Sequence, residues 1–563
     1  MTTAMQIFKP FLTTLLIAAS VNLAAARDGD VRLPDIGSSA AAAMSQGEQD
    51  RYGASVLNEL RSYGLVLDDP LLNDYLYGLG HRLAAAGDRP DLGFTFFIMR
   101  DNEINAFAVP GGYIGVNAGL INVMQREDEL AGVIGHEIAH ISQQHLLRAY
   151  EDARKSSLPI ALAMLGAMIA TSGRTDDAAQ AALISGTALI QQKQINFTRS
   201  DEIEADRIGI QTLAKAGFDP HAMGDAFTAL GRVMRVNGVD VPEFLRTHPV
   251  DVNRIADAKS RADALDNSAR NRRDNISSIP VGRAASGGLL GQWKAPALAT
   301  SVDDRTLSEA YYQLMRERSR VLAATSASSM AAYYSKNFKD DTAFDTPATR
   351  YGYALALIRA DRGDAAKEQL TQLVQSDPHQ PLFQLALAQA MERRGERIAA
   401  EKRFETLQSN FPGNRAYALA LADALIARAE KPPAQRAQSL LRPLLEKYPN
   451  DPDLQRSFAR ACELSGDKAR AAEAYADVAW LNGRAEDALG QLKALADKPD
   501  LDYYQRARVD ARIAQMTPEV LELRRRGEKA ADQGKSDQWR ENAACAGALC
   551  ATVSSQRNIG SLQ

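Results

Sequence analysis

Apolar residues recur at helical spacing along the segment that begins at Glu127, at Leu130, Val133, Ile134, Ile138 and Ile141. A helix with 3.6 residues per turn places side chains at this spacing on one face, and the positions between them fall on the other. The pattern therefore predicts an amphipathic helix that packs one side against a core.

A different pattern precedes this helix. Residues 94–99, Phe-Thr-Phe-Phe-Ile-Met, are rich in aromatic and branched side chains, and Tyr113–Val116 is a second run typical of a strand. Pro110-Gly111-Gly112 predicts a turn directly before the second run. We therefore expect a small antiparallel sheet. It is either a purely structural hairpin or a sheet whose unpaired edge binds an extended peptide through backbone hydrogen bonds.

From residue 305 onward the chain is rich in Ala, Leu and Arg, in helical pairs. Pro378, Pro412 and Pro449 recur at intervals of 34 and 37 residues, and glycine followed by a charged residue marks turns between the helices. This period, with small residues such as Ala471 and Ala474 before Tyr475, is typical of tetratricopeptide repeats. Such repeats stack into a curved solenoid whose concave face binds extended chains or partner proteins.

The amino-terminal residues have the pattern of a secretory signal. Lys9 gives a positively charged start, Phe11–Val21 is an apolar run, and Ala24–Ala26 matches a small-residue cleavage site. The apolar run is too short for a permanent membrane anchor, and no cysteine follows it to carry a lipid. We therefore expect an exported protein in the periplasm.

A second apolar run, Leu158–Ala170, is also short for a membrane span, and Pro159 and Gly166 interrupt it. Two structures fit this pattern. One is a segment that covers the site, either as a helical lid or as an amphipathic segment that touches the membrane interface, and the other is a buried core helix.

Composition narrows the class of protein. At 563 residues the chain is too long for one core, so two or three domains are expected. The net charge is −4 and no basic block stands out, which argues against nucleic acid as a partner. Three cysteines exclude a disulfide framework; Cys545 and Cys550 can form one small bridge in an oxidising compartment, whereas Cys462 stays unpaired.

The predicted helix carries candidate chemistry in His136-Glu137-Ile138-Ala139-His140. At 3.6 residues per turn the two imidazoles lie about 40° apart around the helix, so both can face one metal ion. Glu137 lies about 100° from His136, within reach of a metal-bound water but off the metal. This H-E-x-x-H spacing is that of zinc peptidases. The alternative is a helix with two solvated histidines.

His145 is the nearest candidate for a third ligand. It follows His140 by five residues, which turns it about 140° away on a continuous helix. Gln143 and Leu146 stand where the metzincin pattern needs Gly and His. We therefore reject the metzincin pattern and predict that His145 lies on the helix surface.

A second predicted helix, which starts near Thr198, offers better ligands. Glu202 and Asp206 are one turn apart and share a face. Glu202 would complete a His, His, Glu set with one position open for water, and Asp206 would accept the outer N–H of a ligand histidine. Glu204 is a rival ligand, and an acidic first turn favoured only by the helix dipole is the alternative.

These motifs, together with Asn105–Gly112, resemble those of the gluzincin zinc metalloproteases that include the CAAX prenyl proteases and HtpX. The match by motif covers residues 45–260. With its leader and repeats, the architecture is similar to the β-barrel assembly-enhancing branch of that group. The resemblance implies that Glu202 is the third zinc ligand and that Asp206 supports a ligand. It also implies a substrate-binding strand made of Asn105, Ala106, Phe107, Ala108, Val109 and Pro110.

One more segment carries the resemblance. Thr247-His248-Pro249, followed by Arg254 and Ile255, is similar to the T-H-P-x-x-x-x-R-I segment of these proteases. The resemblance implies that His248 is a regulatory fourth ligand that occupies the open zinc position and holds the enzyme latent. By chemistry alone, His248 is a loop histidine before a proline.

The expected fold is mainly α: a zincin-type α+β metalloprotease domain with a small antiparallel sheet, followed by a helical tetratricopeptide-repeat solenoid. The expected divisions are a signal peptide at 1–26, the metalloprotease domain at 27–270, a linker at 271–304, the repeats at 305–515, and a helix and tail at 516–563.

The expected activity is that of an exported, zinc-dependent metalloendopeptidase with one Zn²⁺ per chain, in which Glu137 is the general base. The resemblance implies that its substrates are misfolded or misassembled outer-membrane proteins, and that the repeats recruit these clients or the assembly machinery. The alternative is a chaperone or scaffold whose protease site stays latent. A pure adaptor would leave the H-E-x-x-H motif unexplained.

Overall fold

The computed structural model describes residues 44–149, 199–237, 242–277 and 302–525. The expected signal peptide, the apolar run Leu158–Ala170, most of the expected linker and the pair Cys545 and Cys550 lie outside these ranges. Within them, no helix combines the length and apolarity needed to cross a bilayer.

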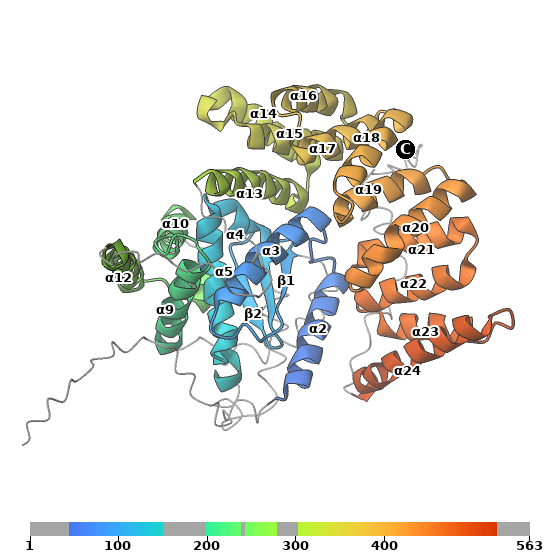
Figure 1. The fold of residues 1–563 in the computed structure, drawn as a ribbon, viewed down its shortest axis with the longest axis horizontal. Helices are drawn as coiled ribbons and strands as arrows, with labels where there is room; N and C mark the ends of the chain where they lie inside the picture. The colour runs from blue at the N-terminus through green and yellow to red at the C-terminus, as the bar shows by residue number, and fades with distance from the viewer. Residues whose placement is uncertain (1–43, 150–198, 238–241, 278–301, 526–563) are drawn as a thin grey trace, which may run out of the picture.

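The first part of the chain, from α2 to the end of α12 at Ser277, packs helices around a small sheet (Figure 1). Its helices are α2 (Gln46–Ser62), α3 (Pro70–Ala86), α4 (Ala118–Val123), α5 (Glu127–Ser142), α9 (Arg199–Lys215), α10 (Ala222–Asn237), α11 (Glu243–Thr247) and α12 (Val252–Ser277). Its strands are β1 (Thr95–Met99), β2 (Ala106–Val109) and β3 (Tyr113–Asn117).

The sheet is mixed, not purely antiparallel as expected. Strand order is β1-β3-β2, with β3 parallel to β1 and antiparallel to β2. The turn at Gly111 and Gly112, whose φ angles are +88° and +82°, closes a hairpin between β2 and β3. The hydrophobic pattern did not predict strand β2, because its sequence, Ala-Phe-Ala-Val, lacks a run of branched residues. Only the family resemblance indicated a strand at this position.

Helix α5 lies at the centre of this part and packs against α3, α9 and α10. The expected helix from Glu127 is present, and its first turn is acidic, which suits the helix dipole. Every residue from Glu129 to His140 is buried, so the helix is not amphipathic toward solvent. Its polar positions instead face an interior site.

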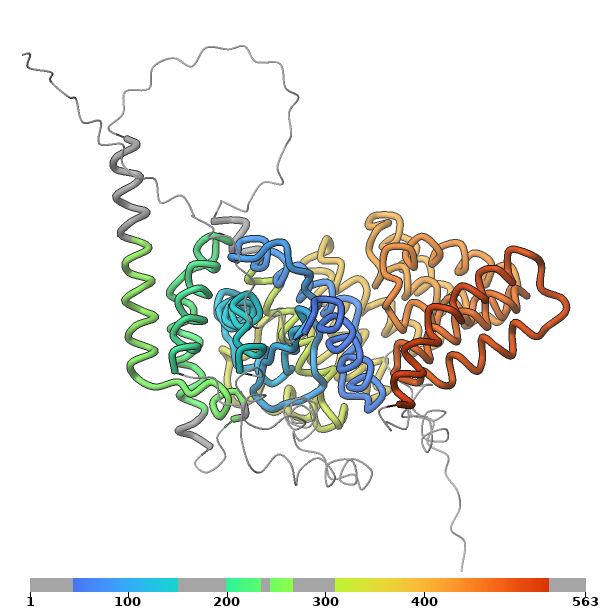
Figure 2. Tube along the Cα trace, turned by 90° about the horizontal axis from the view of Figure 1, so that it is seen from below, coloured from blue at the N-terminus to red at the C-terminus, as the bar shows by residue number. Residues whose placement is uncertain are grey.

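The remaining helices form consecutive antiparallel pairs in a curved row (Figures 1 and 2). They are α13 (Val302–Ala323), α14 (Ala327–Asp340), a 3-10 turn (Thr342–Phe344), α15 (Pro347–Arg359), α16 (Gly363–Ser376), α17 (Pro381–Arg393), α18 (Arg397–Asn410), α19 (Arg415–Ile426), α20 (Lys431–Lys447), α21 (Pro452–Ser465), α22 (Lys468–Leu481), α23 (Ala485–Ala496) and α24 (Tyr503–Arg525). The recurring prolines Pro378, Pro412 and Pro449 lie in the turns before α17, α19 and α21.

The two parts share one apolar core, which runs from the sheet and α5 through α13 into the helical pairs. Helix α13 packs on α4 and α3, and its buried Tyr312 hydroxyl lies 2.9 Å from the carbonyl of Met124. Arg318 of α13 donates two hydrogen bonds, of 2.8 and 2.6 Å, to the carboxylate of Asp69. The repeats are therefore packed onto the first part through both apolar and ionic contacts.

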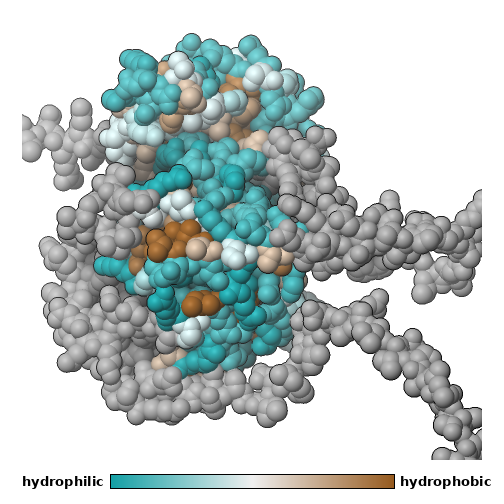
Figure 3. Space-filling view, turned by 90° about the vertical axis from the view of Figure 1, so that its left-hand side faces the viewer, coloured by the Kyte–Doolittle hydropathy of each residue, from teal (hydrophilic) through white to brown (hydrophobic). Residues whose placement is uncertain are grey.

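Helix α12 lies on the outer side of the first part, away from the repeats (Figures 1 and 2). Among the coloured residues seen from that side, most of the surface is hydrophilic, with small apolar patches (Figure 3). Val252, the first residue of α12, has 78% of its surface exposed.

Candidate metal centre

The site depends on how closely α5 and α9 approach each other. Gly135 and Gly209 face each other where the two helices pack. A Cβ atom on Gly209 would lie 2.7 Å from Met223 Cε and 3.2 Å from the backbone nitrogen of His136. Glycine at this position therefore lets α9 bring Glu202 and Asp206 against the histidines of α5.

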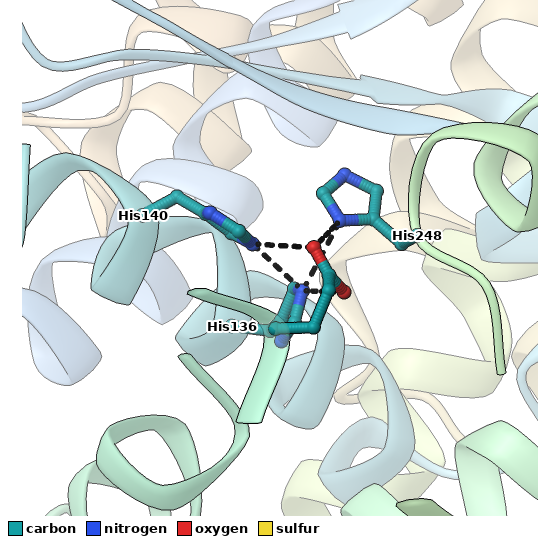
Figure 4. Close-up of side chains that lie close together, drawn as sticks. His136, His140 and His248 are labelled. Carbon is teal, nitrogen blue, oxygen red and sulfur yellow. Dashed lines mark hydrogen bonds and ion pairs between the residues drawn. The ribbon is translucent and has the colours of Figure 1, made fainter. Parts of the chain in front are cut away.

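Four buried side chains from three segments converge: His136 and His140 of α5, Glu202 of α9 and His248 after α11 (Figure 4). Their candidate ligand atoms all lie within 4.8 Å of one another. His140 Nε2 is 2.9 Å from His136 Nε2 and 3.5 Å from Glu202 Oε1. His248 Nδ1 is 2.9 Å from Glu202 Oε1 and 3.4 Å from His136 Nε2.

This arrangement fits a divalent cation. Ligand atoms bonded at 2.0–2.1 Å to a tetrahedral zinc ion would be separated by about 3.3 Å. The four separations given above run from 2.9 to 3.5 Å, in a set whose atoms all lie within 4.8 Å of one another. Two buried imidazole Nε2 atoms lie 2.9 Å apart, close enough for both to bind one ion once they are unprotonated. Three imidazoles and one carboxylate are a donor set that suits Zn²⁺.

Behind the cluster, the carboxylate of Asp206 faces the far side of His136. Asp206 Oδ1 is 3.0 Å from His136 Nδ1, where it can hold that nitrogen protonated and leave Nε2 directed at the cluster. Arg254 in turn donates to both oxygens of Asp206, at 2.8 and 2.7 Å.

Arg254 also joins the cluster to the loop that carries His248. Its Nη1 lies 2.7 Å from Glu202 Oε2 and donates a 2.8 Å hydrogen bond to the carbonyl of Pro249. The sequence contained Arg254 in a motif, but no sequence signal assigned it this position, because its partners lie far away in the chain. Its guanidinium offsets part of the buried negative charge.

The electrostatics of the cluster also favour a cation. Burial by itself would lower the pKa of His136, but its contacts with Asp206 and Glu202 raise it to about 10. Burial and the neighbouring imidazoles lower the pKa of His140 well below its ordinary value. Burial opposes ionisation of Glu202, yet the charge of His248 and the contact with His136 hold its pKa far below the usual range. The carboxylates of Glu202 and Asp206 thus supply the negative charge of the site, and the lowered pKa keeps His140 neutral, the form that binds a metal ion.

Glu137 stands beside the cluster and is not part of it. It is 1% exposed, and its Oε1 accepts no hydrogen bond from any described residue. Across the site, His248 Nε2 lies 3.8 Å from Glu137 Oε1. Burial raises the pKa of Glu137 above its ordinary value, as suits a group that accepts and returns a proton near neutral pH.

The prediction for His145 was wrong: this side chain is buried, not on the helix surface. Helix α5 ends at Ser142, and Gln144 adopts a left-handed conformation with φ of +56°, so the chain turns back. The rotation expected for a continuous helix therefore does not apply. The rival ligand Glu204 lies with His145, at 3.2 Å, and outside the four-residue cluster.

The segment Asn105–Pro110 forms strand β2 and its flanks, at the edge of the sheet. No other strand in the described parts of the chain pairs with its outer side. Strand β2 packs beside α5, and Phe107 lies across Gly115 of the neighbouring strand. The carbonyl of Ile104, just before β2, accepts a 3.2 Å hydrogen bond from Phe244, whose own carbonyl accepts from the backbone of His248.

Several known proteins are similar to this chain in sequence. Residues 70–262 match the model of peptidase family M48. The chain is 36% identical to the putative β-barrel assembly-enhancing protease of Vibrio cholerae over 65% of this chain and 68% of that protein. It is 29% identical to the β-barrel assembly-enhancing protease of Yersinia pestis, over 90% of this chain and 96% of that protein. It is also similar to the mitochondrial metalloendopeptidase OMA1 of Arabidopsis thaliana, with 28% identity over 36% of this chain and 39% of that protein.

Proposed function

The chain belongs to peptidase family M48 and is a metalloendopeptidase, and from this premise we propose that it hydrolyses peptide bonds of misfolded or misassembled outer-membrane proteins in the periplasm. The observation that carries the proposal is the buried cluster of His136, His140, Glu202 and His248 with Glu137 beside it. The name of the bacterial relatives, β-barrel assembly-enhancing protease, supports the class of client. The secretory pattern at the amino terminus supports the location.

We assign His136, His140 and Glu202 as the residues that hold one Zn²⁺. When bound, the ion supplies Lewis acidity toward the scissile carbonyl and toward water. Asp206 holds the proton on His136 Nδ1 and so keeps Nε2 available as a ligand atom.

Glu137 is the proton carrier in this proposal. Its buried carboxylate takes a proton from the attacking water and later delivers it to the nitrogen of the leaving amine. The free Oε1 and the raised pKa of Glu137 suit both steps, since the group must change its protonation state twice in each turnover.

The outer edge of β2 is the proposed binding site for the substrate. An extended polypeptide would lie along Asn105–Pro110 as a further strand, held by backbone hydrogen bonds. Backbone recognition tolerates many sequences, which suits a protease that acts on misassembled proteins of varied sequence.

His248 is the proposed latch. Its imidazole lies within the cluster, where it would occupy the position that water needs, and its backbone is hydrogen-bonded to α11. This placement also favours a second candidate function, a chaperone or scaffold with a latent protease site. In a gated protease, peptide hydrolysis begins when His248 leaves the cluster. In a chaperone or scaffold with a latent site, His248 stays in place.

The helical pairs within residues 305–515 are the proposed tetratricopeptide-repeat module that recruits clients or the assembly machinery. Their antiparallel pairing and the spacing of Pro378, Pro412 and Pro449 support this assignment.

Cleavage of casein tests the function. The mature wild type, Glu137→Gln and His248→Ala would each be assayed with and without a chelator of divalent metals. We expect chelator-sensitive cleavage that rises in His248→Ala and disappears in Glu137→Gln. Cleavage that resists the chelator, or that survives in Glu137→Gln, would contradict the proposed reaction. Suppression of aggregation by a Glu137→Gln protein that no longer cleaves would show that a chaperone role exists beside proteolysis.

A further inference from the structure

His145 is a buried titratable group that contacts the cluster and has no role in the proposed reaction. Its side chain is fully enclosed, and its Nδ1 lies 2.8 Å from Nδ1 of His140, with the two rings at 78°. This contact is on the side of His140 opposite the nitrogen that enters the cluster. Its Nε2 lies 3.2 Å from Oε2 of Glu204.

Once His140 binds a metal ion through Nε2, these contacts determine where the protons of His140 and His145 lie. For His140 to offer a lone pair at Nε2, its proton must be on Nδ1. That N–H can donate only if His145 Nδ1 is unprotonated, which places the His145 proton on Nε2. The carboxylate of Glu204 accepts from this N–H, because an ionised carboxylate is an acceptor only.

The two ligand histidines are therefore supported in different ways. His136 meets the carboxylate of Asp206 directly, at 3.0 Å. His140 contacts the imidazole of His145, and it is His145 that contacts the carboxylate of Glu204. The left-handed Gln144 makes this possible, since it turns the chain so that His145 returns to His140.

His145 is not itself part of a second metal site. With Asp201 and Glu204 it forms a group of potential ligands, but Arg148 already occupies those carboxylates. The Arg148 Nη2 atom lies 3.1 Å from both Asp201 Oδ1 and Glu204 Oε2. A guanidinium at this point satisfies the acidic oxygens and repels a cation.

We propose that His145 is a positioning residue that fixes the tautomer and the ring orientation of His140 and, with Glu204 behind it, sets the affinity of the centre for its metal ion. The proposal rests on the assignment of His140 as a ligand. Loss of such a supporting partner typically weakens metal binding roughly 10- to 100-fold.

The test is the dissociation constant for Zn²⁺, measured by competition with a chromophoric chelator on the full chain without its signal peptide. His145→Phe keeps a flat ring of similar size but removes the acceptor, and we expect zinc binding to weaken about 10- to 100-fold. His145→Asn returns an amide oxygen near the position of Nδ1, and we expect it to recover most of the loss. His221→Phe is the matched control, since His221 Nε2 also meets a carboxylate, Asp266 Oδ2 at 3.2 Å, away from the cluster. It should bind zinc as the wild type does.

Wild-type affinity in His145→Phe would overturn the proposal, and so would a His145→Asn variant as weak as His145→Phe. A wild type that binds no zinc would instead refute the proposed metal centre. Should His145→Phe not fold, long-range ¹H–¹⁵N correlation spectra of histidine-labelled, zinc-loaded wild type decide the matter. We expect the proton of His145 on Nε2. A proton on Nδ1 would refute the proposal that this nitrogen accepts a hydrogen bond from His140.

Discussion

At the scale of single residues, Glu137 is distinguished from its neighbours by being buried beside the cluster without joining it. Glu137→Gln keeps the size of the side chain but removes the group that carries the proton. We expect kcat to fall roughly 10²- to 10⁴-fold while the zinc content per chain, measured by atomic absorption, stays as in the wild type. Glu392→Gln is a fitting control, because burial also raises the pKa of Glu392 but this residue lies in α17. A Glu137→Gln enzyme that retains its turnover would remove Glu137 from the mechanism.

Some of the individual residues of the site could be predicted from the sequence, and others could not. His136, Glu137 and His140 lie on one helix, so local periodicity alone placed them together. Glu202 and Asp206 were found for the same reason within α9, although their distance from the histidines was not predictable. Arg254 and His145 were not assigned a role, because one depends on contacts between distant segments and the other on a single left-handed residue, Gln144.

At the scale of elements, the contact between α5 and α9 sets the geometry of the metal centre. Gly209→Ala would place a methyl group against Met223 Cε and the backbone nitrogen of His136. We expect a loss of about 1–3 kcal/mol in the free energy of unfolding by urea, together with weaker zinc binding, since Glu202 would be displaced from the histidines. Gly78→Ala in α3 is the control, because a Cβ atom there meets open space. That variant should be unchanged or more stable by about 0.4–1 kcal/mol.

The elements also explain how far the fold was predictable. The helix from Glu127, the strands near 95 and 113 and the helical pairs follow from local patterns and are present. The mixed sheet was missed because β2 is short and alanine-rich, so the hairpin was assigned to the wrong pair of strands. The domain divisions, including the linker at 271–304, stay predictions.

At the scale of the whole molecule, a buried ion pair joins the repeats to the first part. Burial alone would raise the pKa of Asp69, but the charge of Arg318 outweighs burial and holds that pKa below its ordinary value. Arg318→Met would leave the carboxylate buried without its partner, and we expect a loss of about 3–5 kcal/mol in urea unfolding at pH 7. Lys336→Met, which breaks an exposed pair with Asp340, should leave stability unchanged. Equal effects of the two variants would show that the junction contributes little.

The pH dependence of that pair has a definite sign. The folded state lowers the pKa of Asp69, so the stabilisation is complete above the pKa of the unfolded chain and is lost as pH falls through the folded value. As pH is lowered, the melting temperature of the wild type should therefore fall further than that of a double variant, Asp69→Asn with Arg318→Met. Parallel acid profiles for the two proteins would contradict this account.

Asp453, at the start of α21, makes a contribution to stability whose pH dependence has the opposite sign. Burial, with Asp451 and Asp68 nearby, raises its pKa to about 8. The folded state thus favours the protonated form, and stability declines as pH rises from the unfolded value through about 8. Asp453→Asn should remove this decline, so that its melting temperature exceeds that of the wild type at pH 9 but not at pH 4. A wild-type profile that is flat between these values would contradict the prediction.

The core that the sheet and α13 share with the helical pairs up to α22 has a consequence for how a long client would be cut. Two parts joined in this way keep a constant separation, since no loose hinge lies between α13 and α4 among the described residues. If the repeats bind a client at one point, the bond that is cut must lie at least as many residues away as an extended chain needs to span that distance. Fragments that keep the bound segment would then have a minimum length, and a client too short to reach both sites at once would not be cut while it is bound.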